Sequence, residues 1–119
     1  MGDQKFFIDL KKKMDPYVRI VYKISKELPK EELYGIISQL RRSAMSVILN
    51  YIEGFARKKK ALKQNFWEIS YGSIKESKYI IYFSFTEKLF QNNDLYNQAL
   101  NLADEIGAML WSCIRSLED

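Results

Sequence analysis

The sequence predicts an all-α fold, an up-down-up-down four-helix bundle in which residues 1–119 form a single domain. Apolar residues recur at steps of three and four along most of the chain, and no segment shows the apolar–polar alternation of a half-buried strand. Glycine and proline are scarce, five and two residues, and they stand where helices should begin or end. A domain of 119 residues can bury a core without metals or disulfides.

The two prolines bound the first helix. Asp15-Pro16 has the pattern of an N-cap followed by proline at the first helical position, which predicts a helix over Tyr17–Glu27. Residues 3–14 could extend this helix, with a kink at the proline. We expect the helix to stop at Leu28-Pro29, because the residue before a proline is disfavoured in the α conformation.

The second helix is predicted within the segment Leu28–Arg57, with Glu31 and Glu32 in its first turn. It carries two stripes of opposite character. The apolar stripe, which should face the core, consists of Leu33, Ile37, Leu40, Ala44, Val47, Tyr51 and Phe55. The polar stripe follows the same rhythm at Gln39, Ser43, Ser46, Asn50, Glu53 and Arg57. Met45, Leu49 and Ile52 add apolar surface that one bundle core seldom needs. We interpret the helix as buried twice, once inside its own subunit and once, through these three residues, against another subunit.

The third and fourth helices are predicted over about residues 62–90 and from the turn Gln91–Asp94 to Leu117. The third helix has a narrow side formed by Ser70, Ser73, Ser77 and Ser84. Such a side would let a neighbouring helix approach closely while the hydroxyls bond back to the preceding turn. The aromatic run Tyr79–Phe85 covers every side of the helix, so we expect it to serve core and subunit interface together. An apolar groove for a partner protein is the alternative.

Composition argues against several function classes. Histidine is absent, which removes histidine bases, Ser-His-Asp and Cys-His arrangements and nearly all common zinc sites. Cys113, the one cysteine, lies among apolar residues of the last helix and is expected to be a buried, inert thiol. We therefore expect no enzyme activity, no cofactor and no metal. No apolar stretch is long enough to cross a bilayer. Residues 1–15 carry charge throughout, which argues against a signal peptide, so we expect a cytoplasmic protein without membrane contact.

Asn50 and Glu53 are polar residues in an otherwise apolar stretch, and such groups need partners if they are buried. Glu76 of the third helix could complete a network with them. Arg57, four residues beyond Glu53, can pair with it, and Arg42 could join from the preceding turns. We interpret the first three as a structural polar network that fixes helix register. A ligand or partner contact is the alternative. A metal site built on Glu53 and Glu76 is the weakest interpretation, because the two carboxylates stand without an Asp-rich loop.

The candidate nucleic-acid-binding residues are a dense basic cluster and two earlier arginines: Arg57, Lys58, Lys59, Lys60, Lys63, Arg41 and Arg42. Phe66 and Trp67 follow the cluster closely, and basic residues beside aromatics suit phosphate contact combined with base stacking. The alternative is a solvated loop that keeps the protein soluble, because 19 basic and 15 acidic residues give a net charge of only +4. In an oligomer, identical clusters around one axis would multiply the positive potential.

Three segments of the second helix carry motifs of a known family: Leu-Pro-Lys-Glu-Glu at Leu28–Glu32, Ser-Gln-Leu-Arg-Arg at Ser38–Arg42 and Asn-x-x-Glu-Gly at Asn50–Gly54. A Gly-Ser-x-x-Glu pattern follows at Gly72–Glu76. With these motifs the chain resembles the bacterial four-helix-bundle family that includes the 23S rRNA intervening sequence proteins and the accessory variability proteins of diversity-generating retroelements. The chain departs from the family pattern at Ile48, where proline is common, so we expect a straighter helix here.

The resemblance implies a homopentameric barrel of four-helix subunits without enzyme activity. For the retroelement members it also implies binding to a reverse transcriptase and to nucleic acid. Two functions follow from residues and resemblance together. The first is a non-enzymatic, oligomeric adaptor that binds RNA or DNA. The alternative is a protein–protein interaction scaffold that binds no nucleic acid and uses its basic residues for solubility.

Overall fold

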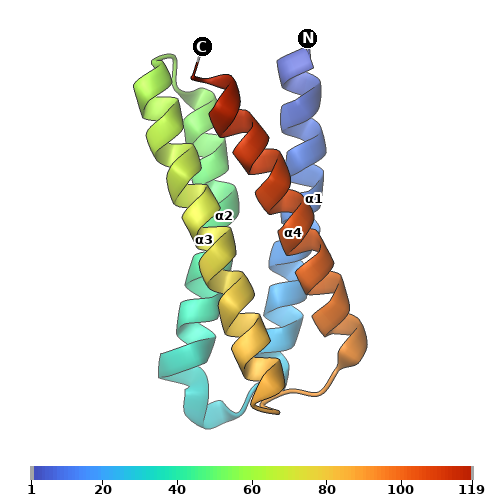
Figure 1. The fold of residues 1–119 in the computed structure, drawn as a ribbon. Coiled ribbons are helices and arrows are strands. Elements are labelled where there is room, and N and C mark those ends of the chain that lie inside the picture. The colour runs from blue at the N-terminus through green and yellow to red at the C-terminus, as the bar shows by residue number, and fades with distance from the viewer. Residues whose placement is uncertain (1, 119) are drawn as a thin grey trace.

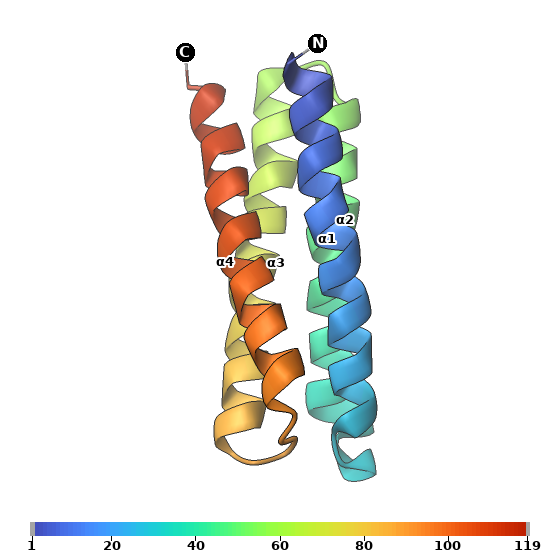
Figure 2. The same cartoon turned by 90° about the vertical axis from the view of Figure 1, so that its right-hand side faces the viewer.

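A computed structural model describes the backbone of residues 2–118 and the side chains of residues 5–118. Four helices pack as a bundle, which confirms the predicted all-α class: α1 (Gly2–Glu27), α2 (Ser38–Ala56), α3 (Lys60–Thr86) and α4 (Asn93–Ser116). Neighbours in sequence run in opposite directions, and the molecule measures 45 × 25 × 18 Å (Figure 1). Both chain ends lie beside the α2–α3 connection, and the quarter-turned view shows the same arrangement (Figure 2). We call this the terminal end of the bundle and the opposite one the far end.

Helix α1 runs through Pro16 as one element, so the predicted start at Asp15-Pro16 is wrong and the earlier residues do extend the helix. The Asp15 carboxylate accepts a hydrogen bond from Arg19 Nε at 3.0 Å instead of capping a helix. A proline inside a helix removes one backbone hydrogen bond. Burial of Leu10 and Met14, both fully inside the core, offsets that cost and holds the earlier turns on the bundle.

Helix α2 begins at Ser38, later than the predicted first turn at Glu31 and Glu32. A 3₁₀ turn over Lys30–Glu32 and a wider π-type turn over Leu33–Ile37 come before it, and Gly35 leaves the helical region with φ −114° and ψ −105°. The apolar stripe therefore reaches the core only from Ile37 onward, while Leu33 is 44% exposed. The predicted helix is too long because the apolar residues keep their helical spacing across Gly35. The sequence pattern therefore does not reveal the one non-helical residue.

The serine side of α3 packs on α2 and α1 as the narrow side predicts. Ser70 Oγ donates to Val47 O of α2 at 2.6 Å, and Ser77 Oγ lies 2.7 Å from the Tyr17 hydroxyl of α1. Small side chains let the helices approach, and most of these hydroxyls reach across to neighbours instead of only back along their own helix. Among the described residues, Ser84 Oγ is the buried side-chain polar atom without a hydrogen-bond partner.

The far end is closed by rings and by a helix cap. Phe85 stacks on Tyr96 with centroids 3.9 Å apart and meets Phe90 edge-on at 5.5 Å. The side chain of Asn92 accepts from the backbone N–H of Leu95 at 3.1 Å, which confirms the predicted N-cap in the turn before α4. At this end the ring cluster fills the core and the Asn92 cap stabilises the start of α4.

Two outward faces of the subunit are apolar. On α2, Leu49 is 53% and Ile52 37% exposed, and Met45 beside them is half-buried. On α3, Ile69, Tyr79 and Phe83 are exposed along the face that points away from the core, whereas Ile81 of the same aromatic run is buried. None of the described helices is both long and apolar enough to span a bilayer.

Candidate nucleic-acid interface

The α2–α3 connection and the first residue of α3 form a run of four exposed cations, Arg57, Lys58, Lys59 and Lys60, which we call the basic connection. Lys59 occupies the N-cap position of α3, where its side chain makes no capping hydrogen bond, and the first turn of α3 holds no acidic residue. The N-terminus of a helix carries partial positive charge and unpaired N–H groups, so it favours anions and disfavours cations. The local sequence therefore runs against helix stability at this point.

The side chain of Arg57 is positioned by an ion pair and by an aromatic ring. Its guanidinium pairs with the Glu53 carboxylate one turn earlier on α2, as predicted, and lies 5.4 Å from the centre of the Phe66 ring. Both partners of the ion pair are about half exposed, so the pair contributes little to stability. Its effect is to keep the guanidinium beside an aromatic ring at the surface of the terminal end.

Lys63 has a structural position within the predicted cluster. Its ammonium donates to the carbonyl oxygens of Gly54 at 3.3 Å and Phe55 at 3.0 Å, and it lies 5.6 Å from the centre of the Trp67 ring. It therefore satisfies carbonyls at the C-terminus of α2, where cations are favoured. An ammonium has three donors, so this arrangement leaves at most one for a ligand.

Arg41 and Arg42 lie apart from the basic connection. Arg42 and Arg57 are fifteen positions apart, which corresponds to about 22 Å along a helix. Arg41 Nε donates to Ser25 Oγ at 2.8 Å and the guanidinium lies 5.0 Å from the centre of the Tyr22 ring, so this side chain ties α2 to α1. Arg42 is exposed. The seven predicted residues thus form one compact site at the terminal end and a second, separate position nearer the far end.

The predicted polar network has different members. Asn50 Nδ2 donates to the backbone oxygen and the Oγ of Ser46, at 3.0 and 2.9 Å, and Ser46 Oγ lies 2.7 Å from Ser73 Oγ of α3. Glu53 and Glu76 are both exposed, and Glu53 turns to Arg57 instead of Asn50. Among the side chains of residues 5–118, no three acidic or cysteine residues gather closely enough to hold a metal ion.

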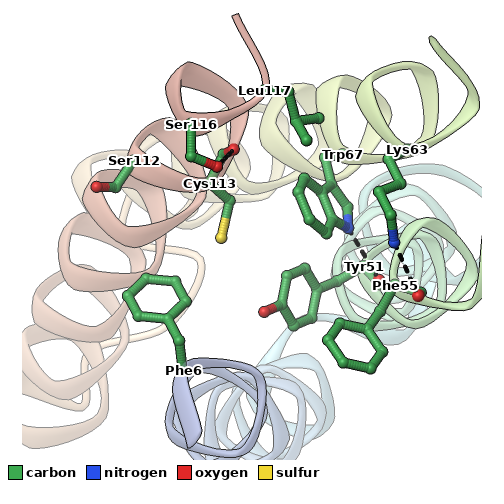
Figure 3. A pocket seen from close by; sticks show the side chains of 9 residues that line it. All are labelled: Phe6, Tyr51, Phe55, Lys63, Trp67, Ser112, Cys113, Ser116 and Leu117. Carbon is green, nitrogen blue, oxygen red and sulfur yellow. Dashed lines mark hydrogen bonds between the residues drawn. The ribbon is translucent and has the colours of Figure 1, made fainter. Parts of the chain in front are cut away.

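A pocket of about 400 Å³ opens at the terminal end between all four helices (Figure 3). We call it the terminal pocket, and it is lined by Phe6, Tyr51, Phe55, Lys63, Trp67, Ser112, Cys113, Ser116 and Leu117. The Tyr51 hydroxyl and the Cys113 sulfur point into the space, while the Trp67 indole donates its Nε1–H to Tyr51 O at 3.1 Å (Figure 3). Burial, and secondarily Cys113, raises the pKa of Tyr51 well above its usual range, so its phenol is neutral at ordinary pH.

Sequence reasoning missed this pocket because its walls come from the two ends and the middle of the chain. One signal was present in Gly54. A Cβ added there would lie 2.4 Å from Cδ1 of Trp67, so only glycine lets the indole lie against α2. Cys113 is buried as predicted, at the pocket wall.

The fold recurs in a solved structure of low sequence identity. The crystal structure of a protein of unknown function from the S23 ribosomal protein family of Bacteroides thetaiotaomicron is 20% identical, covers 89% of this chain and 98% of its own, and superposes with a TM-score of 0.80. At this identity the likeness concerns the fold alone. No curated protein matches the sequence significantly.

The sequence profile of one family matches residues 8–112, which include the whole of α2 and α3 and therefore the basic connection. With nearly its full length matched, the chain belongs to the 23S rRNA-intervening sequence protein family.

Proposed function

We propose that this chain is a non-enzymatic, oligomeric adaptor that binds nucleic acid through the phosphates, with the basic connection as its contact surface. The observation that carries the proposal is the placement of Lys58, Lys59 and Lys60 at the N-terminus of α3, without a cap and without an acidic neighbour in the first turn. An acidic or hydroxyl residue there would stabilise the helix. Departures from local stability rules concentrate at functional sites.

The same arrangement suits a phosphate group. Backbone N–H groups at a helix N-terminus already attract anions, and three lysines beside them add full positive charges that can replace condensed counterions on a nucleic acid. Arg57 adds a guanidinium beside Phe66, which offers a planar cation next to a ring. The family name refers to 23S rRNA, so RNA is the first nucleic acid to test, with DNA as the comparison.

Assembly from identical subunits would strengthen such weak contacts. The outward apolar faces of α2 and α3 are larger than one subunit needs, and a Cβ added at Gly72, in the middle of α3, would meet no neighbour within 4 Å. Since glycine weakens a helix and the subunit's own packing does not require it, we propose that a second copy approaches α3 closely there. A ring of copies would repeat the basic connection and raise affinity through multivalency.

The binding test is the salt dependence of affinity for RNA, measured by fluorescence anisotropy. The log–log slope should flatten by about 0.7 on a single strand, and about 0.9 on a duplex, for every phosphate that the protein no longer neutralises. Replacing Lys58, Lys59 and Lys60 together by Gln should therefore flatten the slope by about two units or more. The matched control replaces Lys11, Lys12 and Lys13 by Gln, which removes the same charge from α1. Equal slopes for both triple variants would remove the basic connection from the interface.

The assembly test is native mass spectrometry of the unmodified protein and of Leu49→Glu. A multimer that becomes a smaller, still helical species in the variant supports burial of the α2 face against another copy. Tyr34→Glu is the control, since that side chain is 93% exposed in the turn before α2. A monomeric parent protein would refute the oligomeric part of the proposal.

A second candidate is a protein–protein scaffold, with a reverse transcriptase as one class of partner. The observation in its favour is that the α2 and α3 faces offer apolar surface, whereas Lys63 and Arg41 are already engaged inside the fold. This candidate predicts no RNA or DNA binding at physiological salt, so the anisotropy experiment distinguishes the two.

A further inference from the structure

We propose that the terminal pocket receives one unstacked nucleobase from a single strand whose phosphates run along the basic connection. This inference deepens the proposed function and rests on it. A nucleobase combines two flat apolar faces with an edge of hydrogen-bond donors and acceptors. The pocket provides a matching set of surfaces, and its volume of about 400 Å³ lies within the usual range for small-ligand sites.

The faces of a base would meet aromatic walls. Phe6 comes from α1, Tyr51 and Phe55 from α2 and Trp67 from α3, so rings approach the hollow from three helices (Figure 3). Tyr51 and Trp67 pack against each other in the pocket wall, with centroids 5.8 Å apart and an interplanar angle of 29°. Proteins that bind unpaired bases use such rings as stacking platforms.

The edge of a base would meet the polar groups that point into the pocket. The Tyr51 phenol is neutral and already interacts with the Cys113 thiol, and its oxygen can accept a further hydrogen bond. A purely apolar ligand would displace water from this wall and offer no hydrogen bond in return. A group with alternating donors and acceptors fits the wall better.

Lys63 joins the pocket to the proposed phosphate track. It lines the pocket, and it follows the basic connection by one helical turn on α3. With two of its donors on backbone oxygens of α2, its charge is fixed at the pocket wall. A duplex keeps its bases stacked inside, so entry of a base requires a single strand or a flipped nucleotide. The geometry therefore predicts preference for single strands.

The test uses Trp67 fluorescence. The chain has two tryptophans, and Trp111→Phe leaves Trp67 as the reporter in the pocket wall. Titrations use adenosine monophosphate, a single-stranded RNA of about ten nucleotides, within the usual site size of single-strand binders, and the duplex of the same sequence. Cys113→Phe fills the pocket, and Cys113→Ser is the matched control that keeps it open. Ser116→Phe blocks the pocket from a second position if Cys113→Phe does not fold, which circular dichroism reports.

We expect saturable quenching by the single strand and by adenosine monophosphate. Filling the pocket should weaken single-strand binding about tenfold, as loss of one stacked base does, and leave duplex binding within about twofold. Tyr51→Phe should reduce discrimination among the four mononucleotides while it keeps the stacking surface.

Other outcomes separate the pocket from the proposed function. Single-strand binding that depends on Lys58–Lys60 but not on the filled pocket overturns the pocket and keeps the function. Quenching by the mononucleotide without any binding of the strand assigns the pocket to free nucleotides and overturns the single-strand proposal. Absence of binding to strand and duplex by the parent protein overturns the proposed function and this inference together.

Discussion

The two ends of the bundle are built on different principles. At the far end, the ring cluster of Phe85, Phe90 and Tyr96 fills the space between the connections, and Asn92 caps α4. At the terminal end, cations stand at the start of α3 and a pocket remains between the helices. Local sequence and tertiary packing agree where α4 begins at the far end, and they conflict where α3 begins at the terminal end. Such a conflict marks the terminal end as the place where selection acted on something besides stability.

The largest expected effect is the loss of a ring at the far end. Phe90 is 3% exposed, so Phe90→Ala should lower the free energy of unfolding by about 3–5 kcal/mol. Phe6→Ala, which deletes a half-buried ring from the pocket wall, should cost clearly less because that ring already borders open space. Urea unfolding measures both. An equal decrease in the free energy of unfolding for both variants would mean that the two ends are packed equally tightly, against the comparison made above.

A smaller effect is expected from two identical substitutions at different glycines. Gly54→Ala places a Cβ against the Trp67 indole and should lower the free energy of unfolding by about 1–3 kcal/mol. Gly72→Ala meets no neighbour in the subunit and should raise it by about 0.5–1 kcal/mol for the isolated subunit. Thermal unfolding at low protein concentration shows whether each variant is more or less stable than the parent protein. A decrease at Gly72 under these conditions would show that the subunit itself needs the glycine.

In the middle of the bundle, the buried Tyr17 should make the free energy of unfolding depend on alkaline pH. Burial raises the pKa of Tyr17 above that of the unfolded chain, which lies near 10, although the hydrogen bond with Ser77 acts the other way. A raised pKa in the folded state gives stability that is complete below about pH 10 and is lost as pH rises beyond it. Tyr17→Phe should therefore cost about 1 kcal/mol at pH 7 and unfold with a shallower dependence on pH above about 10. Urea unfolding at neutral, mildly alkaline and strongly alkaline pH tests this, and an unchanged alkaline slope would contradict it.

The smallest effects concern the two helix caps. Asn92→Ala should cost about 1 kcal/mol by removing the cap of α4. Lys59→Asp should stabilise α3 by a few tenths to about 1 kcal/mol while it weakens RNA binding. Thermal unfolding and anisotropy on the same samples give both values. A destabilised Lys59→Asp variant would remove the argument that this lysine opposes stability.

Helix periodicity correctly predicted those features that depend on the residue spacing within a single helix. The core stripe from Ile37 to Tyr51 and the serine side of α3 are in place, because each follows from spacing along a cylinder. Spacing also predicted the pairing of Glu53 with Arg57, which are four residues apart.

Partners on other helices were less accessible to sequence reasoning. Asn50 bonds to Ser46 of its own helix, and Ser46 meets Ser73 of α3, a contact that depends on the rotation of α2 against α3. Gly35 shows the same limit within the chain, since one residue outside the helical region reset the helix while the apolar pattern continued across it. The pocket depends on the fit of all four helices at once, so no single segment could disclose it.

The position of the chain ends has a practical consequence. Both lie at the terminal end, so a purification tag or fusion partner on either one would stand beside the basic connection and the terminal pocket (Figures 1 and 2). A circular permutant, with the ends joined by a short linker and the chain opened at the highly exposed Tyr34, would move any attachment to the far end. Such a rearranged chain would keep the four helices and leave the basic connection and the terminal pocket uncovered, so it would suit binding measurements on an immobilised protein.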